Sequence, residues 1–179
     1  MTQIGVNYGG ALYDLAKEEN LAAKILSQLQ VLEESFAREE NFLRLLSAPN
    51  ITKEERCQVV DKSFRGKVHP YVLNFLKLLT ERGYAKYFAD CCKSFEERYN
   101  QDHGILPVEA VTAVALTEVQ AEKLTEKLSA ATGKKVLLQN KVDPMCLGGV
   151  RLHYDGIQVD GTVKNRLDTM RDLLKNTVL

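Results

Sequence analysis

The sequence predicts an α+β protein of two domains, an N-terminal six-helix bundle followed by a small strand-helix-strand-strand-strand-helix domain. Up to about His103 the apolar residues recur at the helical spacings of three and four. After Gly104 the chain changes to valine-rich runs and alternating patterns that are typical of strands. The chain of 179 residues has room for two small domains, and we expect them to span residues 1–104 and 105–179.

Apolar stripes and a proline define the first three helices. The first stripe contains Tyr8, Leu12 and Leu15, and a second helix follows it closely. The stripe of that second helix consists of Leu21, Ile25, Leu29, Leu32 and Phe36. A short third helix begins near Asn41 and stops at Pro49, because a proline disfavours helix at the residue before it.

Capping residues mark the next helices. Thr52 and Glu55 have the spacing of a capping box, so a fourth helix starts there and ends near Gly66. Pro70 suits the first turn of a fifth helix, and Gly83 suits its C-terminal cap. The sixth helix is indicated by apolar residues at spacings of four, three and four, namely Phe88, Cys92, Phe95 and Tyr99.

The second domain begins with residues 105–116, which lack a helical polar face and predict a strand buried on both sides. Thr117 and Gln120 then cap a helix that ends at Gly133. Two alternating segments, 136–142 and 150–154, predict strands, and Asp155-Gly156 predicts a hairpin turn into a fourth. The domain closes with an amphipathic helix whose apolar stripe contains Val163, Leu167, Met170 and Leu174.

Composition and charge exclude several classes of protein. Basic and acidic residues both number 24 without a basic stripe, so we expect no nucleic-acid binding. The apolar stretch 72–79 is interrupted by Asn74 and Lys77 and is far shorter than the ~20 residues that span a bilayer. The first residues resemble neither a secretory signal nor a transit peptide, so we expect a chain kept in the cytoplasm.

The residues provide no support for catalysis, for a cofactor or for a metal site. The sequence has no GxxxxGK[ST], GxGxxG, GxSxG or HExxH pattern. The four cysteines form no CxxC pair and have no histidine at ligand spacing, so we expect buried structural thiols. A small enzyme that uses Cys91 or Cys92 as a nucleophile is a rival hypothesis without a readable histidine-acid arrangement.

The fifth helix carries more apolar surface than one core requires. Its apolar residues cover an arc of roughly 220°, whereas packing on a core needs a stripe of about 100° or somewhat more. Asn74, Lys77, Thr80 and Glu81 form the expected polar face. Two interpretations remain equally open, a central helix surrounded by its own bundle or one wall of a groove for a helix of another protein.

The first helix favours the groove. Its small residues Gly9, Gly10, Ala11 and Ala16 permit close helix approach and, beside a wide apolar helix, would form a shallow docking surface. The predicted binding residues are Tyr8, Ala11, Leu12, Leu15, Tyr71, Phe75, Leu78 and Leu79.

Three segments resemble the delta subunits of bacterial F-type ATP synthases, relatives of the mitochondrial oligomycin sensitivity conferral protein. They are residues 7–16, residues 75–84, and the closing stretch from Gly148-Gly149-Val150 through Asp160-Gly161-Thr162. Gly9-Gly10 and Thr162 depart from the pattern of the family. The resemblance covers essentially the whole chain, and the closing stretch is its most specific part.

The resemblance implies a stator subunit without catalytic activity or cofactor. The helical domain would bind the N-terminal helix of an alpha subunit, and the second domain would meet the C-terminal end of the b subunits. Association with the cytoplasmic side of a bacterial cell membrane would occur only through the complex. The chief alternative is a generic cytoplasmic adaptor that binds a helix.

Overall fold

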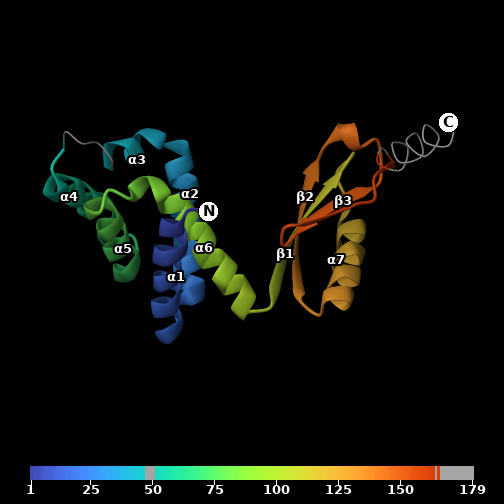
Figure 1. Ribbon diagram of the computed structural model, residues 1–179, viewed down its shortest axis with the longest axis horizontal. Helices are drawn as coiled ribbons and strands as arrows, with labels where there is room; N and C mark the ends of the chain where they lie inside the picture. Colours follow the sequence, from blue (N-terminus) through green and yellow to red (C-terminus); the bar gives the residue numbers. More distant parts are fainter. Residues whose placement is uncertain (47–50, 164, 166–179) are drawn as a thin grey trace, which may run out of the picture. The chain divides into compact units, whose positions relative to one another are not determined.

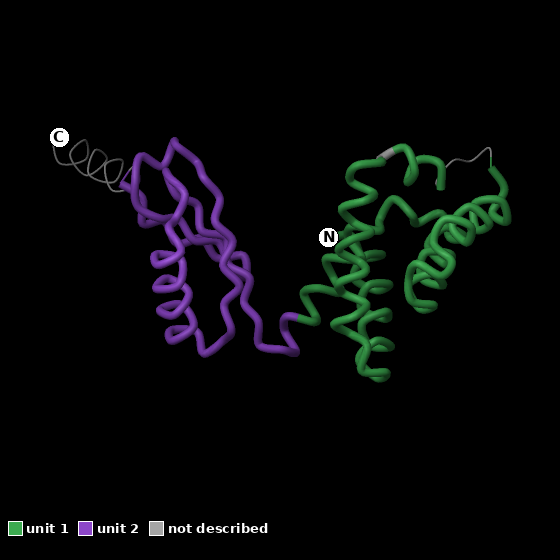
Figure 2. The backbone as a smooth tube through the Cα atoms, turned by 180° about the vertical axis from the view of Figure 1, so that it is seen from behind, with its two compact units in different colours: residues 1–99 green, residues 100–179 purple. Residues whose placement is uncertain are grey.

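Seven α-helices and a four-stranded sheet make up the part of the chain that the computed structural model describes, residues 1–46, 51–163 and 165 (Figure 1). The predicted α+β class is confirmed. The predicted terminal helix lies almost entirely outside the described residues. The chain divides into two compact units, residues 1–99 and 100–179, which we call the helical unit and the sheet unit (Figure 2).

The helices of the helical unit follow the predicted order. They are α1 (Gln3–Glu18), α2 (Ala22–Arg38), α3 (Glu40–Leu46), α4 (Lys53–Phe64), α5 (Pro70–Glu81), the 3₁₀ turn η1 (Ala85–Tyr87) and α6 (Phe88–Asp102), which runs into the second unit. The capping box of α4 is confirmed, because Thr52 accepts a hydrogen bond from the Glu55 amide and the Glu55 carboxylate accepts one from the Thr52 amide. Pro70 occupies the first turn of α5, as predicted.

The core of the helical unit contains apolar side chains from all six helices. Phe36 lies at the centre of an aromatic group in which its ring contacts those of Phe42, Phe64 and Phe88 at centroid distances of 5.5, 5.9 and 5.0 Å. Ring contacts of this kind stabilise a core beyond the burial of area.

Helix α1 packs against α6 through glycines. A Cβ atom at Gly9 would lie 2.3 Å from the carbonyl oxygen of Cys91, and one at Gly5 would lie 2.5 Å from Cβ of Asp90. Because no side chain fits in this space, α1 approaches the backbone of α6 directly. The contact also brings Asp90 to the start of α1, where its carboxylate accepts hydrogen bonds from the Thr2 amide and hydroxyl.

The sheet unit has the strand order β2-β1-β3-β4. Its elements are β1 (Ile105–Thr112), α7 (Glu118–Thr132), β2 (Lys135–Val142), the 3₁₀ turn η2 (Pro144–Cys146), β3 (Val150–Tyr154) and β4 (Ile157–Asp160). Strands β1 and β2 are parallel and joined through α7, whereas β1–β3 and β3–β4 are antiparallel. Thr117 and Gln120 form the predicted capping box of α7, and Gly133 closes the helix in the left-handed conformation.

The prediction that the first strand reaches Leu116 is wrong, and the predicted burial on both sides holds only for part of the strand. The strand ends at Thr112, because the Asn140 side chain donates hydrogen bonds to the Ala110 carbonyl and the Thr112 hydroxyl and accepts one from the Leu116 amide. Within the described residues α7 covers one face of the sheet, where Leu106 and Val108 form a core with Val136. On the other face Pro107 is exposed and Ile105 and Glu109 are half-buried, whereas Val111 is buried.

A two-residue turn at Asp155-Gly156 joins β3 to β4, as predicted, with both residues in the left-handed region. Beyond β4 a group of hydrogen bonds, which we call the Asp160 clasp, fixes the path of the chain. The Asp160 carboxylate accepts hydrogen bonds from the Thr162 amide and hydroxyl at 2.9 and 2.7 Å and from Nε of Arg151 at 2.9 Å. These bonds hold the pKa of Asp160 at about 2, chiefly through the Thr162 hydroxyl.

Candidate functional site

An apolar groove lies between α1 and α5 of the helical unit. It encloses about 370 Å³ and is lined by Tyr8, Ala11, Leu12, Leu15, Tyr71, Asn74, Phe75 and Leu78. On each helix the lining residues repeat at spacings of three and four, so each wall is a row of side chains about two helical turns long. A groove with this lining suits the apolar face of a third helix.

Seven of the eight predicted binding residues line this groove. The exception is Leu79, which is 1% exposed and belongs to the core of the helical unit, while its neighbour Leu78 is 40% exposed. The sequence reasoning missed Asn74, which it had assigned to the polar face of the helix. The helical wheel could have suggested it, because Asn74 lies three residues after Tyr71 and four before Leu78 on the same row.

The wide apolar arc of α5 divides into two parts. Val72, Leu76 and Leu79 are buried in the core, whereas Tyr71 and Leu78 form the wall of the groove, and Phe75, which is 6% exposed, belongs to both. The helix therefore contributes both to the core of its own bundle and to the wall of a groove, and whether another helix binds there stays a prediction.

The predicted polar face of α5 is wrong at Thr80 as well. Thr80 is fully buried, and its hydroxyl is satisfied by donating to the Leu76 carbonyl at 2.8 Å. The remaining two residues of that face turn toward α4, where Lys77 forms an ion pair with Asp61 and the Glu81 carboxylate contacts Cys57.

The small residues of α1 serve mainly the interior of the unit. Gly9 packs on the backbone of α6, Ala16 is fully buried, and the space over Gly10 is occupied by the guanidinium of Arg98. Among the four small residues from which a shallow docking surface was predicted, Ala11 alone lines the groove. The expected close helix approach occurs at Gly9, inside the bundle.

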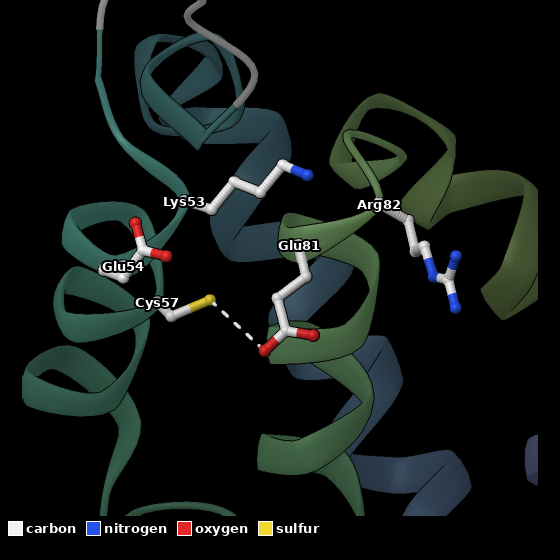
Figure 3. Close-up of a pocket in the computed structure, with 5 residues that line it drawn as sticks. All are labelled: Lys53, Glu54, Cys57, Glu81 and Arg82. Atoms are coloured by element: carbon white, nitrogen blue, oxygen red, sulfur yellow. Dashed lines mark hydrogen bonds between the residues drawn. The ribbon is translucent and has the colours of Figure 1, made fainter.

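A second, polar cavity of about 420 Å³ lies between α4 and α5, lined by Lys53, Glu54, Cys57, Glu81 and Arg82 (Figure 3). The Cys57 thiol points toward the Glu81 carboxylate, with its sulfur 3.9 Å from Oε1. Partial burial, followed by the charge of Glu81, raises the pKa of the Cys57 thiol. Because the thiolate is the nucleophilic form, this thiol is not activated.

The thiols of α6 are also unsuited to nucleophilic catalysis. Cys91 and Cys92 are both buried, and burial raises the pKa of Cys91 to about 11 and that of Cys92 further. In the described part of the chain, no group of His, Cys, Asp or Glu residues could hold a metal ion. No helix among the described residues is long and apolar enough to cross a bilayer.

Comparisons with known proteins agree over nearly the whole chain. The family model for the ATP synthase delta (OSCP) subunit matches residues 4–174. A protein of Alkaliphilus oremlandii described as ATP synthase subunit delta is 32% identical over 98% of both chains. One of Clostridioides difficile with the same description is 30% identical over 98% of this chain and 97% of its own.

A solved structure has the same fold. A chain of the mitochondrial ATP synthase hexamer of Toxoplasma gondii superposes with a TM-score of 0.75, at 20% identity, over 97% of this chain and 98% of its own. At this level of identity the likeness concerns the fold alone.

Proposed function

The chain belongs to the family of ATP synthase delta (OSCP) subunits, and from this premise we propose where it binds its two neighbours. It is a non-catalytic subunit of the peripheral stalk of an F-type ATP synthase, and so a peripheral component of a membrane-bound complex. We propose that the groove between α1 and α5 receives the N-terminal helix of an alpha subunit. The sheet unit would meet the C-terminal end of the b subunits, on the cytoplasmic side of the membrane.

The observation that carries the first contact is the apolar groove itself. Leu78 is 40% exposed and Leu15 is 38% exposed, although both are leucines on the apolar rows of their helices. Covering these side chains with the apolar face of a helix removes their surface from water and so favours association. The shape and the apolar lining of the groove suit a helical partner. The resemblance to the family implies that this partner is the N-terminal helix of an alpha subunit.

The second contact has support in the sheet unit. Val114, Met145 and Leu147 are 74%, 68% and 69% exposed. All three follow the carboxyl ends of β1 and β2, which are neighbouring parallel strands, so they belong to one end of the sheet. Apolar side chains exposed together in this way mark an interaction surface, and we assign it to the b subunits.

The role of the chain is mechanical. A rotary enzyme couples ion flow to ATP synthesis only if its catalytic head is held against the torque of the rotor. A subunit that binds the head through one unit and the stalk through the other contributes binding free energy and stiffness, with no covalent chemistry. A generic adaptor with a helix groove, the alternative hypothesis, would need the groove but not the second surface.

The groove contact is tested by Leu78→Glu and Ala11→Leu. The first places a carboxylate without a partner in an apolar contact, and the second fills the space between the walls, so both should abolish binding of a peptide that copies the alpha N-terminus. Val31→Glu is the matched control, because Val31 is exposed on α2 and lies outside the groove. The free energy of unfolding in urea should change by about 1 kcal/mol or less in each variant, which is the range for surface substitutions.

Calorimetry with the peptide decides the outcome. Native affinity in both variants would reject the groove as the site.

Met145→Glu, with Val119→Glu on α7 as its control, applies the same design to the b subunits. It should weaken binding to the b C-terminal segment and leave the alpha peptide unaffected.

A further inference from the structure

The groove contains one amide, and the other polar side-chain groups among its lining residues are the hydroxyls of Tyr8 and Tyr71. Asn74 lies between Tyr71 and Leu78 on α5, and it is exposed in the free chain. Within the described residues, its side chain forms no hydrogen bond, so its two donors and its acceptor face water. The remaining lining is aliphatic, apart from the rings of Tyr8, Tyr71 and Phe75.

A docked helix changes the surroundings of this amide. The leucines on both walls would be covered equally well by any apolar side chain, so they permit the partner to slide by one helical turn. The amide of Asn74 opposes such sliding, because removing it from water without a hydrogen-bond partner is costly. A polar side chain opposite the amide restores its hydrogen bonds. A single asparagine fixes the register of a coiled coil by this mechanism.

We propose that Asn74 is a specificity-determining residue that sets the register and identity of the helix bound in the groove. This inference rests on the proposed function and commits to the same occupant, the N-terminal helix of the alpha subunit. That helix must place a polar, hydrogen-bonding side chain opposite Asn74, with apolar residues three and four positions to either side to cover Leu15 and Leu78. The groove is about two turns long, roughly 10 Å, so it contacts one such repeat.

The experiment is a double-mutant cycle between the full chain and a peptide that copies the alpha N-terminus. Each polar residue on the apolar side of the peptide helix is replaced in turn by leucine. Against the unmodified chain, one replacement should weaken binding by about tenfold or more, equivalent to ~1.4 kcal/mol. Against Asn74→Leu the same replacement should have little effect or strengthen binding, because an apolar pair then replaces the polar one.

Gln58→Leu is the matched control, since it makes a similar change from amide to leucine on the exposed surface of α4, outside the groove. It should bind every peptide as the unmodified chain does. The free energy of unfolding in urea should be close to that of the unmodified chain for both Asn74→Leu and Gln58→Leu, because both side chains are exposed.

The possible outcomes are distinguishable. If the peptide binds and Leu78→Glu abolishes binding, but Asn74→Leu couples to no peptide position, the groove stands and the role of Asn74 is rejected. If the peptide does not bind at all, the proposed function fails as well. If light scattering shows that the chain dimerises and that Leu78→Glu dissolves the dimer, the occupant is a second copy, which overturns the proposal.

Discussion

At the residue scale, the contact between α1 and α6 depends on what each glycine meets. Gly9 faces the carbonyl oxygen of Cys91, which belongs to the backbone of a packed helix and cannot move aside. Gly10 faces the end of the Arg98 side chain, which also pairs with Asp14 at 3.1 Å on the surface. Neighbouring glycines of one helix are therefore needed to different degrees.

We predict that Gly9→Ala destabilises the chain by about 2 kcal/mol, although alanine favours helix by roughly 1 kcal/mol relative to glycine. Gly10→Ala is the matched control and should be nearly neutral, because the arginine can swing away and its surface ion pair contributes little. Urea unfolding of the two variants measures the difference. Equal stability would show that the helices can separate to admit a methyl group at Gly9.

At the element scale, local signals predicted the ends of elements well. Thr52 with Glu55, Pro70, Thr117 with Gln120 and the Asp155-Gly156 turn act through their own backbone neighbours, so the sequence alone contains the cause. The end of β1 could not be predicted in this way. It depends on Asn140, a residue that parallel pairing brings beside Ala110 from the next strand.

The candidate site was predictable to the level of the helical row. Spacing placed seven of the eight residues on the walls of the groove, but it assigned Leu79 to the wall and Asn74 to the solvent. A helical wheel gives the direction of each side chain around its own helix axis. It does not say which of these directions is covered by a neighbouring helix. Likewise the glycines of α1 signalled a close approach without saying whether the partner is α6 or another protein.

The Asp160 clasp makes the join between β3, β4 and the following residues sensitive to acid. The pKa of Asp160 in the folded chain is about 2, below the ordinary value of 3.8. The folded state therefore binds the proton less readily than the unfolded state, and the stabilisation is fully present above about pH 4. It is lost as the pH falls from about 4 toward 2.

We predict that Asp160→Asn lowers the melting temperature of the sheet unit at neutral pH, and that the difference from the unmodified chain shrinks as the pH falls through this window. Circular dichroism melts of both chains at several pH values provide the measurement. A carboxyl carbon titration by NMR reads the pKa of Asp160 directly. A difference that stays constant down to pH 2 would contradict the assigned role of the ionised carboxylate.

At the scale of the whole molecule, the two units have separate cores. The buried cluster of the helical unit runs from Leu12 to Phe95, and that of the sheet unit consists of Leu106, Val108 and Val136. The first cluster lies entirely within the helical unit, and the groove is lined by residues of the same unit.

We predict that a fragment of residues 1–102, which ends with α6, unfolds cooperatively and binds the alpha peptide with the affinity of the full chain. A fragment of residues 1–87 is the control, because it lacks Phe88, Cys92 and Phe95 and should not fold. Thermal melting followed by calorimetry tests both. Absence of a cooperative transition in the longer fragment would mean that the helical unit depends on the sheet unit.

The glycine contact of α1 has a consequence for how force passes through the chain. Tyr8, Ala11, Leu12 and Leu15 of α1 line the groove, while Gly5 and Gly9 on an adjoining face touch the backbone of α6, the helix that leads into β1. Side chains packed between two helices can change rotamer under load, so such a helix–helix contact is compliant. At Gly5 and Gly9 α1 instead meets the backbone of α6, so a load on the groove face of α1 would pass to α6 with little change of side-chain conformation.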